Sequence, residues 1–161
     1  MARIPNLGPR GEGWVLVQVV LLVAIGFAGL AVLPSGVPLG PIRVAALVLG
    51  GLGTVVGGMV AVTSILALGS NLSPFPRPTA ANELVATGAY RYLRHPVYAG
   101  IVLAAIGWGL LTASLLAIAL SFILLFWFDL KARREEAWLA ARHPSYEAYR
   151  ARTRKFVPFI Y

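Results

Sequence analysis

The sequence contains no cysteine and few charged residues among its 161 positions. Without cysteine the chain can form no disulfide, no thiolate zinc site and no cysteine nucleophile, and cysteine usage gives no information about its redox compartment. Charged residues make up only 12% of the chain, against roughly 25% in soluble proteins, and 58% of the residues are hydrophobic. A membrane environment is the simplest explanation for this composition.

Ionisable side chains are scarce and unevenly placed. Two histidines and six acidic residues leave few candidates for chemistry. The net charge of +8 comes mostly from basic residues near the two ends and beside apolar runs, with no accompanying nucleic-acid-binding motif. We therefore attribute the charge to membrane topology and expect no nucleic-acid partner.

Two uncharged apolar runs in the first half of the chain are long enough to cross a bilayer, which takes about 20 residues. Residues 14–33 contain only Gln18 as a strongly polar side chain, and the run exceeds the core of a secretory signal, so we predict a retained spanning helix. A second span is predicted at residues 44–68, after a turn rich in Pro and Gly. Three glycines share one face of it and permit close helix contact: Gly50, Gly53 and Gly57.

A third uncharged run, residues 97–128, is longer than one span requires, since a single helix of that length would measure about 48 Å. It is either one long tilted helix or a tight hairpin. The hairpin would break near Gly107, Gly109, Thr112 and Ser114.

Basic residues favour the hairpin. If the run crosses once, the loop at residues 69–96 and the basic C-terminal tail fall on opposite sides of the membrane. If it crosses twice, the N-terminus, the loop and the tail share one side and only Arg43 lies on the other. The positive-inside rule therefore predicts four spans with both termini cytoplasmic.

The predicted fold is an all-α integral membrane protein with a single domain at residues 1–161. The spans are expected at about 14–33, 44–68, 97–110 and 112–128, the last two forming the hairpin. The tail, residues 129–161, is expected to be an interfacial or cytoplasmic helix. Pro144 should interrupt it, with His143 outside helical geometry.

Chemistry is expected outside the spans, which contain no Asp, Glu, Lys, Arg or His. Ion-coupled transporters place such groups within the membrane, so a transporter is disfavoured. The loop at residues 69–96 is longer than ordinary connections, as functional loops often are. Titratable side chains gather at residues 87–98 and 129–149, which the hairpin topology brings to one side of the membrane.

Pro96 is well placed to begin a helix, whose free backbone N–H groups favour anions. Arg91 and Arg94 would reinforce binding of a carboxylate or phosphate. The alternative interpretation is an ordinary positive-inside flank that happens to carry an N-terminal proline.

Two adjacent acids, Glu135 and Glu136, point about 100° apart on a helix, so only one readily faces a given site. A carboxylate there can accept hydrogen bonds from ribose hydroxyls or orient a cationic cofactor. The alternative is ordinary surface ion pairing with Lys131, Arg133 or Arg134.

Both stretches together resemble the isoprenylcysteine carboxyl methyltransferase and phospholipid methyltransferase superfamily. The resemblance rests on the Arg-His-Pro-x-Tyr element at residues 94–98, preceded by Thr-Gly-Ala-Tyr at 87–90, and on the two acids followed by Tyr146 and Tyr149. It covers residues 69–158. A Phe-Gly pair that is frequent before the tyrosines is replaced by His143-Pro144, and the shorter spacing makes Glu135 the preferred acid.

The resemblance implies that S-adenosylmethionine binds at the cytoplasmic ends of the last two spans, with Arg94 and Glu135 as catalytic residues. The residues implied in cofactor binding are Tyr90, Leu93, His95, Pro96, Tyr98, Glu135 and Glu136. Methyl transfer needs no metal, and none is expected. His143 is interpreted as a surface histidine beside a helix break.

The function that these features imply is methyl transfer from S-adenosylmethionine to a lipophilic acceptor that enters from the bilayer. A prenylcysteine-like carboxylate, a phospholipid amine and another small lipophile stay open as acceptors. One alternative is a non-catalytic lipid-binding or assembly protein whose basic segments bind anionic lipid. Another is an NADPH-dependent enzyme related to sterol reductases, which nicotinamide-cofactor binding would reveal.

Overall fold

The computed structural model describes residues 7–8, 11–32, 40–75, 84–158 and 160–161, and this part of the chain contains no β-strand. Its five α-helices are α1 (Glu12–Leu30), α2 (Pro41–Leu68), α3 (Pro96–Thr112), α4 (Leu115–Arg142) and α5 (Tyr146–Arg152). Two short 3-10 helices, η2 (Gly69–Asn71) and η3 (Gly88–Arg91), lie in the loop between α2 and α3. The all-helical class expected from the sequence is confirmed.

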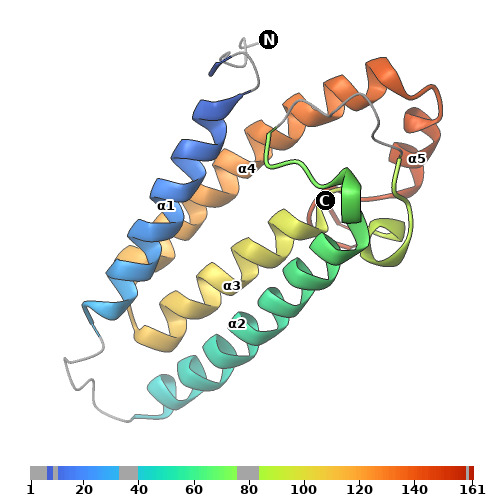
Figure 1. Cartoon of the computed structure of the whole chain (residues 1–161). Helices are drawn as coiled ribbons and strands as arrows, with labels where there is room; N and C mark the ends of the chain where they lie inside the picture. The colour runs from blue at the N-terminus through green and yellow to red at the C-terminus, as the bar shows by residue number, and fades with distance from the viewer. Residues whose placement is uncertain (1–6, 9–10, 33–39, 76–83, 159) are drawn as a thin grey trace.

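The long helices form two neighbouring pairs. α2 packs along α3 and α1 packs along α4, while α3 also contacts α4 (Figure 1). α4 continues past the other helices and carries α5 at its far end (Figure 1). The start of α1 and the C-terminus lie toward that same end, opposite the turn between α3 and α4.

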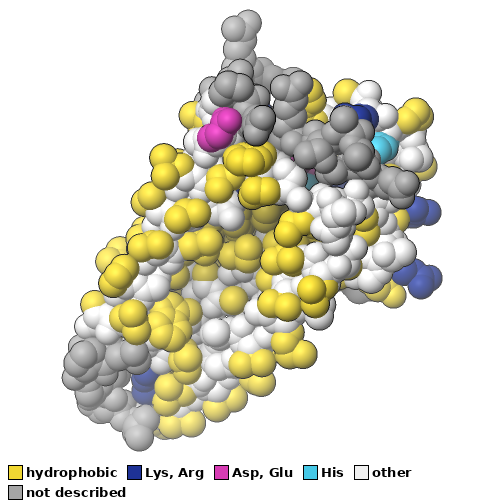
Figure 2. Space-filling model, in the orientation of Figure 1, with side chains coloured by type: hydrophobic (Ala, Val, Ile, Leu, Met, Phe, Trp, Pro, Cys, Tyr) yellow, Lys and Arg dark blue, Asp and Glu magenta, His cyan; other side chains and the backbone are white. Residues whose placement is uncertain are grey.

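Three helices are long and apolar enough to cross a membrane: Glu12–Leu30, Pro41–Asn71 and Leu115–Arg142. α3 is apolar too but shorter. Large side chains such as Phe27 and Leu66, which are 68% and 74% exposed, point away from the protein. Figure 2 shows hydrophobic side chains covering the flank of the helices, with most charged groups near the end that carries α5. Such a surface is stable in hydrocarbon rather than in water.

The third apolar run forms two helices, as the hairpin interpretation predicts. α3 ends at Thr112, and Ala113 adopts a left-handed conformation with φ 57°. Ser114 then caps α4, because its hydroxyl accepts a hydrogen bond from the Ala117 amide at 3.2 Å. Gly107 and Gly109, named as possible break points, instead lie inside α3.

The end of α3 is stabilised by a cation from another helix. Arg43, at the start of α2, donates hydrogen bonds to the carbonyls of Leu110 at 3.0 Å and Leu111 at 2.7 Å. The last carbonyls of a helix have no partner within it, so a basic side chain at this point satisfies them and complements the helix dipole.

Glycines bring α2 and α3 into close contact within one chain. A Cβ added to Gly50 would lie 2.4 Å from the Leu111 nitrogen, and one added to Gly57 would lie 2.4 Å from the Ala104 nitrogen. Gly107 makes an equally close approach to α2 from the other side. The glycine face of the second predicted span is therefore used for packing inside this chain.

The ends of the helices differ from those of the predicted spans at several points. α1 ends at Leu30 rather than at residue 33, which lies outside the described residues. α4 does not stop at residue 128 but continues to Arg142, because the residues that follow are good helix formers and no glycine or proline interrupts them. The tail at 129–161 is thus partly the end of α4, and only α5 is a separate helix. The break at His143, which is extended, occurs where Pro144 predicts it.

Candidate active site

Three segments distant in the sequence meet beside the polar third of α4. Tyr149 of α5 donates hydrogen bonds to the carbonyls of Tyr90 at 2.8 Å and Leu93 at 3.3 Å. The backbone after α5 runs beside the start of α3, since the Arg94 amide donates to the Arg154 carbonyl at 2.7 Å. A parallel bridge joins Leu93 and Arg154. These contacts hold the segment before α3 between α4, α5 and the C-terminal residues.

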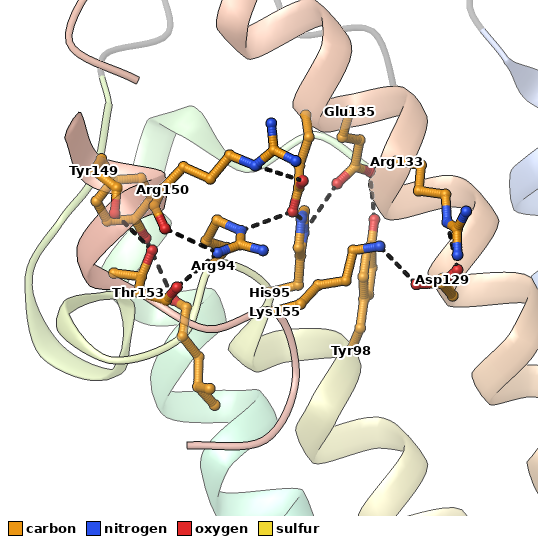
Figure 3. Close-up of polar contacts among 12 residues, drawn as sticks. Arg94, His95, Tyr98, Asp129, Arg133, Glu135, Tyr149, Arg150, Thr153 and Lys155 are labelled. Carbon is orange, nitrogen blue, oxygen red and sulfur yellow. Dashed lines mark hydrogen bonds and ion pairs between the residues drawn. The ribbon is translucent and has the colours of Figure 1, made fainter. Parts of the chain in front are cut away.

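His95 lies between the two adjacent acids of α4 (Figure 3). Its Nε2 is 3.2 Å from Glu136 Oε1, and its Nδ1 is 3.4 Å from Glu135 Oε2. A neutral imidazole has only one N–H, whereas ionised carboxylates only accept hydrogen bonds. The arrangement therefore fits a protonated His95 that donates to both acids.

Electrostatics supports the same protonation state. Burial alone would lower the pKa of His95, because it penalises the charged ring. The hydrogen bonds and negative charges of Glu135 and Glu136 outweigh that effect, so the pKa of His95 is raised above its ordinary value. A positive charge is thus fixed between two negative ones in a buried position.

Arg94 connects α3 to α4 and to the C-terminal segment. Its Nε donates to Glu136 Oε1 at 2.8 Å and its Nη1 donates to the Thr153 carbonyl at 2.7 Å. Arg91 points elsewhere, with its guanidinium 5.9 Å from the centre of the Tyr92 ring. Arg94 lines the cavities on both sides of it, whereas Arg91 lines neither, and the anion site expected at the start of α3 stays a prediction.

Tyr98 orients Glu135. Its hydroxyl donates a hydrogen bond to Glu135, and its ring stacks on Phe128 of α4 with centroids 4.4 Å apart. On its other side lies the His95 ring at 5.5 Å. Glu135 is therefore held by one residue at the start of α3 and one in its first turn, while Glu136 binds Arg94.

A cavity of about 420 Å³ opens beside this cluster, within the range of roughly 300 to 1,000 Å³ for ligand sites. Its walls combine apolar side chains from α2, from α3 and from the loop between these two helices with tyrosines and charged groups. The predicted site residues that line it are Tyr90, Arg94, His95, Tyr98 and Glu135.

The remaining predicted residues are close by but do not line this cavity. Glu136 holds Arg94 and His95 from behind. Pro96 is buried at the first position of α3, and Leu93 is buried with its carbonyl bound to Tyr149. Of the two acids, Glu135 is the one that faces the cavity. His143 lies at the end of α4 and lines neither this cavity nor the basic groove nearby.

Several residues that line the cavity were not among the predicted site residues, including Gln18, Lys131 and the two tyrosines that carried part of the resemblance, Tyr146 and Tyr149. Lys131 precedes Glu135 by one helical turn, so the two residues share one face of the helix. This spacing in the sequence could have identified Lys131 as a site residue. Tyr146 is 1% exposed, and its hydroxyl has no hydrogen-bond partner among the described residues. A buried hydroxyl without a partner is rare, and here it borders a cavity.

A larger, open groove of about 760 Å³ lies on the other side of Arg94. Its basic lining residues are Arg94, Arg133, Arg150, Arg154 and Lys155. Most of these cations already have acidic partners: for example, Asp129 binds Arg133 and Lys155, both at 2.6 Å. Apolar walls and unpaired polar groups make the smaller cavity the better candidate for a cofactor site. Within the described residues, no group of three or more His, Asp or Glu is placed to hold a metal ion.

Comparisons with known proteins agree with this picture. Residues 45–145 match the phospholipid methyltransferase family. The structure is similar to that of a eukaryotic intramembrane Ras methyltransferase, isoprenylcysteine carboxyl methyltransferase, with a TM-score of 0.64 and 23% identity over 97% of this chain and 55% of that one. This likeness concerns the fold.

A curated relative is the cobalt-zinc-cadmium resistance protein CzcN of Cupriavidus metallidurans. It is 36% identical over 80 residues, which are 48% of this chain and 36% of the relative. The chain thus matches only about a third of that protein's length. Because the family match covers more than half of the sequence, the chain belongs to the phospholipid methyltransferase family of multi-pass integral membrane proteins, a family that uses S-adenosylmethionine.

Proposed function

We propose that this chain is an S-adenosylmethionine-dependent methyltransferase that acts on a lipophilic acceptor. One observation carries the proposal: a hydrogen-bonded array of Glu136, His95, Glu135 and Tyr98, the first two buried and the others half-buried, lies at a cavity with apolar walls. In a member of this family such a cavity is the natural place for the cofactor. Membrane-facing helices on the same wall offer a route for a lipophilic acceptor.

The residues present fit the cofactor. Its sulfonium and amino groups are cationic and its ribose carries hydroxyls, and Glu135 can attract the former or accept hydrogen bonds from the latter. The unpartnered Tyr146 hydroxyl is available to a polar atom of the ligand. When bound, the cofactor supplies a methyl group on a sulfonium, which an acceptor lone pair takes as the C–S bond breaks and its electrons return to sulfur.

The protein's part in this reaction is positioning and exclusion of water. Glu135 is the carboxylate that contacts the cofactor, and Tyr98 and His95 fix its two oxygens. Arg94 acts one step away by holding Glu136 and the Thr153 carbonyl, which keeps the C-terminal segment against the start of α3. The catalytic role that the sequence assigns to Arg94 is thus best explained as positioning.

The proposed topology has four crossings, with α3 as the shortest, and both termini in the cytoplasm. The start of α1 and the C-terminus lie toward one end of the helices in Figure 1, and α5 with its basic residues lies there too. Arg43 marks the opposite end, where it caps α3. This distribution follows the positive-inside rule.

Methyl transfer itself tests the proposal. Proteoliposomes made with a lipid extract are incubated with methyl-labelled S-adenosylmethionine, and the label that enters the organic phase is counted. We expect transfer with the wild type and a loss of at least about tenfold with Glu135→Gln, which removes the charge and keeps the shape. Glu147→Gln, an acid with a 68% exposed side chain paired only to Arg150, is the matched control and should retain activity.

Two results would refute the proposal. One is no transfer to any lipid fraction by folded wild type. The other is binding of NADPH, but not of S-adenosylmethionine, to the purified protein, which would favour a reductase. Binding of anionic vesicles without either cofactor would instead favour the non-catalytic lipid-binding alternative.

A further inference from the structure

Lys131 is a buried cation on the cavity wall. Three residues spaced four apart on α4, Lys131, Glu135 and Leu139, line the cavity along one face of the helix. Lys131 is one turn closer than Glu135 to the start of α4, on the side of the apolar helices. It is 1% exposed, although lysine is almost never fully buried unless it is paired.

The partners of this ammonium group are neutral. Its Nζ donates to Gln18 Oε1 of α1 at 2.8 Å and to the Pro74 carbonyl at 2.9 Å. The ion pairs of the described residues do not include it. A lysine ammonium has three N–H donors, so one is left after these two hydrogen bonds. Glu135, one turn along α4, attracts this cation from a distance, but among the described residues no carboxylate forms a direct ion pair with it. Burying such a cation is costly, and a bound anion would reduce that cost.

The position of the ammonium group places it next to the proposed reaction site. Its Nζ is 5.1 Å from the centre of the Tyr98 ring, and the hydroxyl of that ring binds Glu135. Apolar residues of α2, α3 and the loop line the same cavity, among them Ile65, Leu72 and Ile101. A ligand that reaches Lys131 therefore meets one positive charge within largely hydrocarbon surroundings.

The charges on the cavity wall are unbalanced. The ionisable side chains other than tyrosines that line it are Arg94, His95, Lys131 and Glu135. With His95 protonated, Glu135 and Glu136 balance the charges of Arg94 and His95, and the charge of Lys131 is left in excess. A bound sulfonium would add another positive charge. A ligand with an ammonium head group would be repelled, whereas one with an anionic oxygen would be attracted.

We propose that Lys131, held by Gln18, determines which acceptor binds by taking an anionic oxygen of an acidic lipophile and by excluding lipid amines. This inference rests on the proposed function, because it names the class of acceptor for the same cavity. It selects among the acceptor classes that the sequence leaves open. The carboxylate of the cofactor could bind the same ammonium group, so the experiment must distinguish an anionic acceptor from the cofactor.

The test uses three probes with one hydrocarbon chain and different heads: oleate, oleyl alcohol and oleylamine. Each is titrated calorimetrically into detergent-purified protein and corrected against empty micelles, in the presence of S-adenosylhomocysteine. We expect the wild type to bind oleate at least about tenfold more tightly than oleylamine, which corresponds to about 1.4 kcal/mol. Lys131→Met, which keeps the length and removes the charge, should lose that preference.

The control variant is Arg154→Gln, which removes a cation of the open groove outside the cavity and should keep the preference for oleate. S-adenosylhomocysteine is titrated into every variant. If Lys131→Met binds S-adenosylhomocysteine with unchanged affinity, the ammonium group of Lys131 binds the acceptor and not the cofactor. A parallel loss of S-adenosylhomocysteine binding would assign it to the cofactor carboxylate and overturn the proposal.

Equal binding of oleate and oleylamine by the wild type would overturn the proposal without any variant, so the test survives if Lys131→Met fails to fold. An oleate preference that persists in folded Lys131→Met would overturn it as well. These outcomes can be distinguished from failure of the proposed function. In that case the wild type would bind no S-adenosylhomocysteine.

Discussion

At the scale of single residues, the arrangement of the two acids depends on the charge of His95. Its pKa is raised by Glu135 and Glu136, so protonated His95 stabilises the fold fully below the unfolded pKa of about 6.5, and this contribution is lost as the pH rises through the folded pKa. The melting temperature of the wild type should therefore exceed that of His95→Gln most at about pH 6, with a difference that shrinks toward about pH 9. Thermal unfolding in detergent across this range measures it. A constant difference would contradict the imidazolium assignment.

Arg94 should contribute more to stability than its neighbour Arg91. Arg94→Ala leaves the Thr153 carbonyl without its charged donor and leaves Glu136 with His95 and the more distant Arg150, at a cost of about 2 to 3 kcal/mol. Arg91→Ala removes an exposed side chain and should change the free energy of unfolding by less than about 0.5 kcal/mol. Denaturant titration of both variants compares them, and equal effects would refute the positioning role.

Sequence reasoning at this scale found most residues of the cluster but not their geometry. The resemblance identified Glu135 as the preferred acid, and the structure turns Glu135 toward the cavity and Glu136 toward Arg94. It missed Lys131, which was interpreted as a possible surface partner of the acids. Lys131 is buried because Gln18 and Pro74 lie next to it. These residues are far from Lys131 in the sequence, so residue spacing along the helix could not predict the contacts.

At the scale of helices, the contact between α2 and α3 depends on glycines that leave no room for a side chain. Gly57→Ala would place a Cβ 2.4 Å from the Ala104 backbone nitrogen, so the helices must separate, at a cost of about 1 to 3 kcal/mol. At the next residue, Gly58→Ala meets nothing within 4 Å and should be neutral or stabilise by up to about 1 kcal/mol, because alanine favours helix. Melting temperatures of the pair in detergent test this, and equal shifts would show that the two helices do not pack as described.

The presence of the long helices could be predicted from the length of the apolar runs. The residues at which the helices end were harder to predict. The break after Thr112 followed from the length of the run and from charge placement, but its position at Ala113 did not, because alanine rarely adopts positive φ. The last predicted span ends at 128, where charged residues begin, whereas the helix α4 continues to Arg142. A helix can leave the hydrocarbon without ending.

At the scale of the whole molecule, the four crossings that we propose would place the two termini on one side of the membrane. The natural absence of cysteine allows single cysteines to report topology without background. We expect Glu12→Cys and Ala140→Cys to react with an impermeant maleimide from the same side, and Leu115→Cys, which replaces an 82% exposed side chain beside the hairpin turn, from the other. Labelling of oriented vesicles measures this. Reaction of all three from one side would contradict the proposed crossings.

Calorimetric titration of purified wild type with S-adenosylhomocysteine measures whether the cavity beside Glu135 holds S-adenosylmethionine. We expect saturable binding of one ligand per chain. We also expect a loss of at least about tenfold in affinity, or about 1.4 kcal/mol, in Glu135→Gln and none in Glu147→Gln. A folded wild type that binds neither S-adenosylhomocysteine nor S-adenosylmethionine, in detergent and again in lipid nanodiscs, would contradict the assignment of this cavity to the cofactor.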